Sequence, residues 1–215
     1  MTLKEQALSL YKKVFYEDGE DFAKTFTDKY FDKCCRFSKK DGKVVAMLYL
    51  LDCTVFDGEQ THSAFYLYAA ATDPNYRNQG LMSKLINSAL AEDKLIITKP
   101  ANDKLFSFYE KFGFNICSFK DEIKKEFPKE ETLGLEQYIQ LRKKLLKTVP
   151  HIMLSDEKFA LDGFNLFGNG TYCAATDENG EIKEYINGET PQDQKPFAMW
   201  NKNTGHNLYF GIAMD

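Results

Sequence analysis

The sequence lacks the features that mark a membrane, secreted or zinc-binding protein. Its 215 residues contain no apolar run near the roughly 20 residues that a membrane-spanning helix needs. The first residues also lack the basic and then apolar pattern of a signal peptide. The five cysteines are irregularly spaced, and there are only three histidines. We therefore expect free thiols, no metal site and a cytoplasmic location.

The chain also lacks an excess of positive charge. Lys and Arg number 28 against 32 Asp and Glu, which gives a net charge of −4. A protein that binds duplex nucleic acid needs a concentrated basic face, so we expect no nucleic-acid partner. The absence of a long apolar run leads us to expect no membrane partner either. Aromatic residues are plentiful by contrast, with 18 Phe and 12 Tyr beside a single Trp. They are typical of strands and also of platforms for a flat ligand.

The first 120 residues predict an α/β arrangement. Apolar residues recur at helical spacing in the first segment, and Thr2 with Glu5 forms a capping box before them. Asp41 and Gly42 predict a hairpin turn between two apolar arms. Helices alternate with strands from there on, which indicates helices layered on a sheet. The expected helices cover residues 3–15, 21–31, 81–90 and 103–112, and the expected strands cover 36–51 (a hairpin), 63–72, 94–98 and 114–119.

The pattern changes from about residue 120. Residues 120–131 are highly charged and are interpreted as a solvated linker or an edge strand. An amphipathic helix is predicted over 133–146, and short strands with turns follow. Asp177 to Gly180 is the expected turn of a hairpin. The strands expected in this part cover 171–176, 181–186, 196–200 and 208–214.

One stretch between a strand and a helix carries the chemistry. The start of a helix exposes unpaired N–H groups and a partial positive charge. Gly80 allows the backbone to approach a phosphate closely, and Arg77 adds a full positive charge. The combination predicts an anion cradle suited to a pyrophosphate. It is neither the Gly-x-Gly-x-x-Gly dinucleotide fingerprint nor a P-loop.

This stretch resembles the signature of the GNAT superfamily of acetyl-CoA-dependent N-acetyltransferases, which is strand, [Gln/Arg]-x-x-Gly-x-[Gly/Ala], helix. Residues 70–86 read AATDPNYRNQGLMSKLI, with Met82 in place of the final Gly or Ala. Residues 102–114, NDKLFSFYEKFGF, are similar to a later helix of the family. The resemblance implies a mixed, mostly antiparallel sheet flanked by helices. Residues 1–120 would form the acetyl-CoA-binding GNAT domain, and residues 121–215 a smaller α+β extension on the substrate side or for interactions.

The resemblance also implies roles for individual residues. The backbones of Ala70 and Thr72 would pair with the pantetheine arm, and an N–H near Ala70 would polarise the thioester carbonyl. Asn102 would hydrogen-bond the pantetheine. Tyr109 would be a general acid for the leaving thiolate, or else a packed core aromatic. The residues that would bind the pyrophosphate are Arg77, Asn78, Gln79, Gly80, Leu81, Met82 and Ser83.

The implied activity is acetyl transfer to an amine on a small molecule, a peptide or a protein, by direct attack in a ternary complex. Cys53 and Cys117 have no recognisable base partner and are expected to be buried rather than nucleophilic. Two alternatives stay open. Met82 at the cradle favours a module that binds an acyl-CoA without turning it over. The missing first strand of the family leaves a sheet edge that favours a protein-interaction module or a homodimer.

The sequence does not identify the base that deprotonates the amine. Asp52, Glu59 and His62 are candidates, although each is also explained as a solvated loop residue. The terminal carboxylate at Asp215 is another candidate. Some aromatic residues near the C-terminus would line a substrate pocket or form the core of the extension: Phe197, Trp200, Tyr209 and Phe210.

Overall fold

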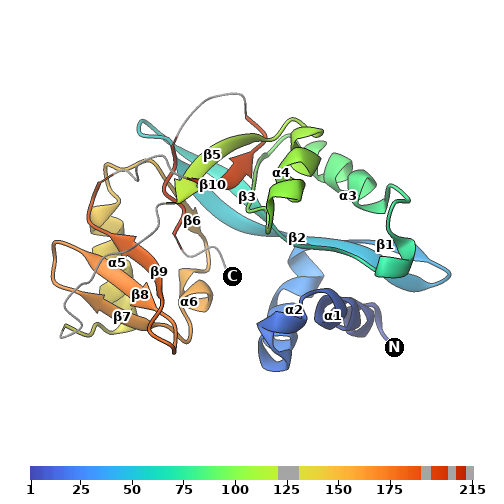
Figure 1. The fold of residues 1–215 in the computed structure, drawn as a ribbon, viewed down its shortest axis with the longest axis horizontal. Coiled ribbons are helices and arrows are strands. Elements are labelled where there is room, and N and C mark those ends of the chain that lie inside the picture. The colour runs from blue at the N-terminus through green and yellow to red at the C-terminus, as the bar shows by residue number, and fades with distance from the viewer. Residues whose placement is uncertain (121–130, 190–194, 203–206, 212–215) are drawn as a thin grey trace. The chain divides into compact units, whose positions relative to one another are not determined.

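The computed structural model describes residues 1–120, 131–189, 195–202 and 207–211, and the chain divides into two compact units. The first unit contains residues 1–52 and 65–98, and the second contains residues 53–64 and 99–215. Both units have buried apolar side chains of their own. Figure 1 labels their helices and strands. The domain boundary placed at residue 120 from the sequence stays a prediction.

The first unit begins with the two expected helices, α1 (Leu3–Val14) and α2 (Glu20–Cys34), joined by the short 3₁₀ helix η1 (Tyr16–Asp18). The capping box at the start of α1 is confirmed. Glu5 N–H donates to Thr2 Oγ1 at 3.2 Å, and Thr2 N–H donates to the Glu5 carboxylate at 2.7 Å. These two bonds satisfy N–H groups that a helix start leaves without partners.

The strands of the first unit follow in the expected order. β1 (Cys35–Lys40) and β2 (Lys43–Phe56) form the predicted hairpin, in which Lys40 is opposite Lys43. The turn residues Asp41 and Gly42 have φ values of 51° and 74°, as a tight hairpin turn with two left-handed residues requires. The strands β3 (Thr61–Thr72) and β4 (Leu95–Thr98) continue the sheet.

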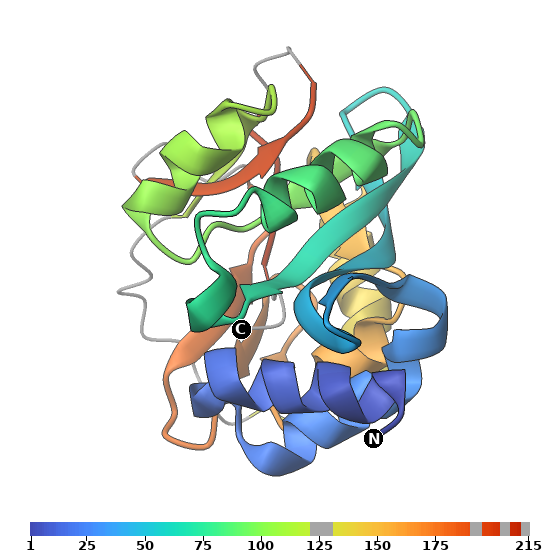
Figure 2. The same cartoon turned by 90° about the vertical axis from the view of Figure 1, so that its right-hand side faces the viewer.

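Helices cover both faces of this sheet. In both views, α1 and α2 lie on one side of β2 and β3, and α3 (Leu81–Leu90) lies on the other (Figure 1 and Figure 2). Every residue of β2 from Val44 to Leu51 is consequently buried. A strand that packs on both faces has a continuous apolar sequence instead of an alternating one.

One phenylalanine organises the core between α1, α2 and the sheet. Phe26 is fully buried, and its ring centre lies 5.5 Å from that of Tyr11, 4.7 Å from Tyr49 and 5.1 Å from Tyr68. Aromatic rings prefer tilted and edge-to-face contacts at these distances. The abundance of Phe and Tyr therefore serves the core in this unit.

Within its described residues, the second unit contains helices and two groups of strands. The helices are α4 (Asp103–Glu110), α5 (Leu135–Leu145) and the short α6 (Glu157–Ala160), and the strands are β5 (Asn115–Lys120), β6 (His151–Leu154), β7 (Asn165–Gly168), β8 (Cys173–Thr176), β9 (Ile182–Ile186) and β10 (Lys195–Trp200). β10 pairs antiparallel with β5, and β6 pairs antiparallel with the end of β2. The strands β7, β8 and β9 form a separate antiparallel sheet.

The fold class expected from the sequence, a mixed and mostly antiparallel sheet flanked by helices with a smaller α+β part, is confirmed. The hairpin turn at Asp177 is also confirmed, because Gly180 N–H donates to Asp177 O at 3.1 Å between β8 and β9. The structure differs from the strand expected at 208–214. Its described residues form only an isolated parallel bridge, between Tyr209 and His151. Most of the expected linker at 120–131 lies outside the described residues.

A buried ion pair lies inside the second unit. The Arg142 guanidinium donates to the Glu184 carboxylate at 3.0 Å from both Nε and Nη2, and to Glu157 at 3.1 Å. Tyr138 also donates to Glu184, at 2.8 Å. Arg142 is only 5% exposed and Glu184 only 1%. Burial and the nearby Glu184 carboxylate raise the pKa of Tyr138, so this phenol remains a hydrogen-bond donor.

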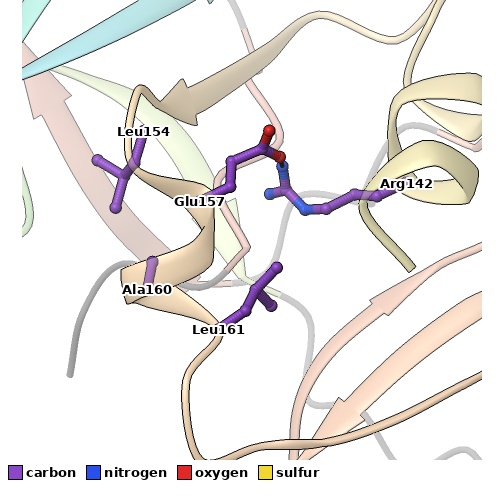
Figure 3. Close-up of a pocket in the computed structure, with 5 residues that line it drawn as sticks. All are labelled: Arg142, Leu154, Glu157, Ala160 and Leu161. Carbon is purple, nitrogen blue, oxygen red and sulfur yellow. Dashed lines mark hydrogen bonds and ion pairs between the residues drawn. The ribbon is translucent and has the colours of Figure 1, made fainter. Parts of the chain in front are cut away.

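A small cavity borders this ion pair (Figure 3). It measures about 10 Å³ and is lined by Arg142, Leu154, Glu157, Ala160 and Leu161. This volume is at the lower bound of what one water molecule needs. The cavity is therefore too small for a substrate, and its charged side chains are paired with each other.

Among the described residues, no helix combines the length and the apolar character that crossing a bilayer requires.

We predict that Glu184→Gln destabilises the protein by about 3–5 kcal/mol, because it leaves the buried Arg142 without its main counter-charge. Denaturant unfolding measures this loss. The matched control is Glu136→Gln, which removes an exposed ion pair with Lys158 and should change stability little. Equal effects of the two substitutions would contradict the importance of the buried pair.

Candidate functional site

The loop after β3 is fixed by one aspartate. Asp73 N–H donates to Val45 O at 2.9 Å, which ties the start of the loop to β2. The Asp73 carboxylate accepts a bond from Asn75 N–H at 3.0 Å and an ion pair from Lys13 at 2.9 Å. These two donors, with Lys13 as the main cause, hold the pKa of Asp73 below its ordinary value. The loop therefore leaves the strand in a defined direction.

The helix that follows, α3, has no side-chain cap at its start. Gly80 is the N-cap of α3, with φ 72° and ψ 9°, and has no side chain to accept a bond. The first helical bond runs from Lys84 N–H to Gly80 O at 3.0 Å, so the N–H groups of residues 81–83 have no acceptor within the helix. A Cβ at Gly80 would meet no atom within 4 Å. The glycine is required for its left-handed backbone, and the space beside it is open.

Positive charge gathers around this helix start. Arg77, exposed before it, donates from Nε to Thr72 O at 3.3 Å. Lys40, at the end of β1, donates to Gln79 Oε1 at 2.7 Å and lies 5.7 Å from the ring centre of Tyr76. Sequence reasoning missed Lys40, because nothing near it in the chain resembles the motif. Two cations and uncapped N–H groups form an electropositive, accessible cradle.

The strand leading into the cradle has a local irregularity. Ala69 has a φ of 48°, a left-handed value that costs a non-glycine residue about 1 kcal/mol. Inside a strand, such a residue turns neighbouring backbone groups out of the regular ladder. Ala70 and Thr72, predicted to bind the pantetheine through their backbones, follow directly and are partly exposed. The sequence Ala-Ala-Ala-Thr gave no signal of the irregularity.

The remaining residues predicted to bind the pyrophosphate lie just before α3 and in its first turn. Asn78 has a positive φ of 59° and is exposed, as is Gln79. Leu81, Met82 and Ser83 form the first turn of α3 and are partly exposed. The Met82 side chain thus lies at the start of the helix, where the family signature has Gly or Ala.

The other two predicted site residues lie in the second unit, on α4. Asn102 is the exposed N-cap of this helix, and its side chain makes no capping bond. Tyr109 is 4% exposed, with ring centres of Phe108 and Phe114 at 5.4 and 5.6 Å. This packing is compatible with the alternative of a core aromatic. The general-acid role of Tyr109 stays a prediction.

Two of the base candidates, His62 and Glu59, lie at or beside the turn between β2 and β3. His62 Nε2 lies 2.6 Å from the Asp57 carboxylate, which also accepts bonds from the N–H groups of Glu59 and Gln60. The His62 and Asp57 pair therefore closes the turn between β2 and β3.

Cys53 and Cys117 are buried as expected, and burial raises the pKa of the Cys117 thiol. A buried neutral thiol is a poor nucleophile.

Other predictions concern the C-terminal part and metal binding. Trp200 and Phe210 are buried in the core of the second unit, and the carboxylate of Asp215 lies outside the described residues. Within the part of the chain that the structure describes, no group of three or more His, Cys, Asp or Glu side chains could hold a metal ion.

Comparison with known proteins gives a family and a fold. The model of a family described as acetyltransferase (GNAT) domain matches residues 2–117. A GCN5-related N-acetyltransferase structure from Kribbella flavida is 13% identical, with a TM-score of 0.64 over 85% of this chain and 54% of that chain. Another from Anabaena variabilis is 16% identical, with a TM-score of 0.62 over 86% and 56%. A search of curated proteins found no match.

The chain spans only about half the length of these two structures. A Pyrococcus horikoshii protein assigned as an acetyltransferase is similar over 97% of this chain and 90% of its own length, with 12% identity and a TM-score of 0.61. At these identities the similarity shows the fold. It extends beyond the residues that the family model matches.

We predict different responses to glycine at two nearby alanines of β3. Ala69→Gly should leave the free energy of unfolding within about 0.5 kcal/mol, because glycine adopts the left-handed backbone freely. Ala71→Gly, at a buried position outside that conformation, should cost about 1 kcal/mol. Denaturant unfolding compares them. A loss at Ala69 as large as that at Ala71 would argue against the irregularity.

Proposed function

The chain belongs to the GNAT family of acetyltransferase domains, and we propose that it transfers an acetyl group from acetyl-CoA to an amine. The observation that carries this proposal is the uncapped start of α3 at Gly80, with Arg77 and Lys40 beside it. Free N–H groups, a helix dipole and two cations match a pyrophosphate in charge and geometry. The open space at Gly80 fits a phosphate in contact with the backbone.

The proposed mechanism uses the backbone of β3. Backbone groups after the irregularity at Ala69 would pair with the pantetheine arm, and an N–H near Ala70 would stabilise the negative charge that develops on the thioester oxygen. The amine would attack the thioester directly. The burial of Cys53 and Cys117 supports a route without an acyl-enzyme. Tyr109 would give a proton to the leaving thiolate.

The acceptor is proposed to be a primary amine on a small molecule or a peptide. The net charge of −4 favours a cationic acceptor in the general sense that opposite charges steer association. The alternative function, a module that binds an acyl-CoA without turnover, rests on Met82 at the first turn of α3. Release of free CoA in the presence of an amine panel distinguishes the two.

We predict that calorimetric titration with acetyl-CoA gives a dissociation constant of about micromolar for the unmodified protein. Arg77→Ala should weaken binding about tenfold or more, because it removes a charge-assisted contact to phosphate. Gly80→Asp should abolish binding, since its carboxylate would occupy the helix start and repel the phosphates.

Two neighbouring lysines give a matched control. Lys40→Ala should weaken binding about threefold, as an exposed charge does, and less so at high salt. Lys39→Ala should have no effect, because successive strand residues point to opposite faces. A folded protein that does not bind acetyl-CoA would overturn the proposed function.

A further inference from the structure

Three polar side chains of the first unit form a hydrogen-bonded series. The Tyr11 hydroxyl, on α1, donates to the Asp18 carboxylate of η1 at 2.5 Å. The Tyr68 hydroxyl, on β3, lies 3.2 Å from the Tyr11 hydroxyl. The series thus runs from the strand, through the helix, to the turn between α1 and α2.

The middle residue of this series is buried, and the residues at its two ends are partly exposed. Tyr11 is 0% exposed, whereas Tyr68 and Asp18 are partly exposed. A buried hydroxyl costs free energy unless it is hydrogen-bonded, and Tyr11 is bonded on both sides. A core built only for stability would place phenylalanine here, as it does at the adjacent Phe26. The geometry is that of a path between two partly exposed residues.

Aromatic rings surround the middle of the path. The rings of Phe15 and Phe26 pack on Tyr11. The titratable groups of this cluster include the phenols Tyr30, Tyr49 and Tyr66 and the Cys35 thiol beside Tyr49. The neighbouring cations of α1 are engaged elsewhere, because Lys12 pairs with Glu20 and Lys13 with Asp73.

The two phenols of the path stay protonated at neutral pH. Burial is the main cause that raises the pKa of Tyr11 and that of Tyr68. Such groups do not hold a negative charge, but each can accept a proton on its oxygen while it gives up its own.

The strand end of the path lies beside the proposed reaction centre. Tyr68 directly precedes Ala69, where β3 is irregular. It is two residues from Ala70, and two residues span at most about 7 Å even in a regular strand. An amine that attacks a thioester held at Ala70 would come within reach of a tyrosine side chain at this position.

We propose that Tyr68 is a catalytic residue that removes a proton from the acceptor ammonium, with Tyr11 and Asp18 as positioning residues that carry the proton away. This proposal rests on the proposed acetyl transfer. As the ammonium gives its proton to the Tyr68 oxygen, the Tyr68 proton passes to Tyr11 and the Tyr11 proton to the Asp18 carboxylate. Both phenols are restored, the amine is neutral, and Asp18 releases the proton to water.

The test compares two probe amines that differ in charge at pH 7.5. Phenethylamine is an ammonium at this pH, whereas hydroxylamine is already neutral. Tyr68→Phe should lower the turnover of phenethylamine by about 100-fold or more and leave that of hydroxylamine within about twofold. The loss with phenethylamine should shrink as the pH rises and more amine becomes neutral. Release of free CoA measures both rates.

The partly exposed Asp18 provides a second variant with little effect on folding. Asp18→Asn should give a smaller loss that is again confined to phenethylamine. Tyr49→Phe is the matched control, since it removes a buried hydroxyl from the same aromatic cluster and should change neither rate. Thermal melting and acetyl-CoA calorimetry show that each variant folds and binds.

The outcomes separate this proposal from the function on which it rests. Equal losses with both amines, or no loss with Tyr68→Phe, would overturn the proton path and leave acetyl transfer standing. If the unmodified protein binds acetyl-CoA but turns over neither amine, the path has no reaction to serve and is overturned as well. Failure to bind acetyl-CoA would overturn the proposed function itself.

Discussion

The direction in which the chain leaves β3 is the constraint on which the proposed site depends. Asp73 sets that direction, because its backbone is tied to β2 at Val45 and its carboxylate holds both the loop and Lys13 of α1. With the loop fixed, α3 starts in front of the strand, and Gly80 leaves that start uncapped. A strand, a loop and a helix dipole thereby converge on one exposed point, where we propose that an anion binds.

The same strand connects this anion cradle to the core. Phe26 packs against the phenols of Tyr11 and Tyr68, and these phenols are bonded in series to Asp18. The cluster is therefore hydrophobic in its ring contacts and polar along one line of oxygen atoms. Ring packing holds the hydroxyl groups in place, which is the condition for passing a proton without rearrangement.

In the second unit, the buried polar groups form an ion pair instead of a series of hydroxyl groups. The Arg142 and Glu184 pair is enclosed and its carboxylate is also bonded to Tyr138. Gly211 approaches this carboxylate so closely that a Cβ would overlap with it. The chain near its C-terminus is thus fitted against a buried charge. Such pairs specify an arrangement more than they stabilise it, because desolvation offsets most of the attraction.

The sequence by itself determined most of the elements and the helix start at Gly80. Local rules apply to the capping box at Thr2, to the Asp41 turn and to the uncapped helix start at Gly80, so each was predictable from a few adjacent residues. The tertiary structure alone decided that Lys40 bonds Gln79, that Ala69 takes a left-handed conformation, and that the hydroxyls of Tyr11 and Tyr68 meet. These features depend on residues 39 or 57 positions apart or on strain that the surrounding sheet imposes. Neither the distant contacts nor the strain can be predicted from local sequence, because the energy that fixes them comes from packing between distant segments.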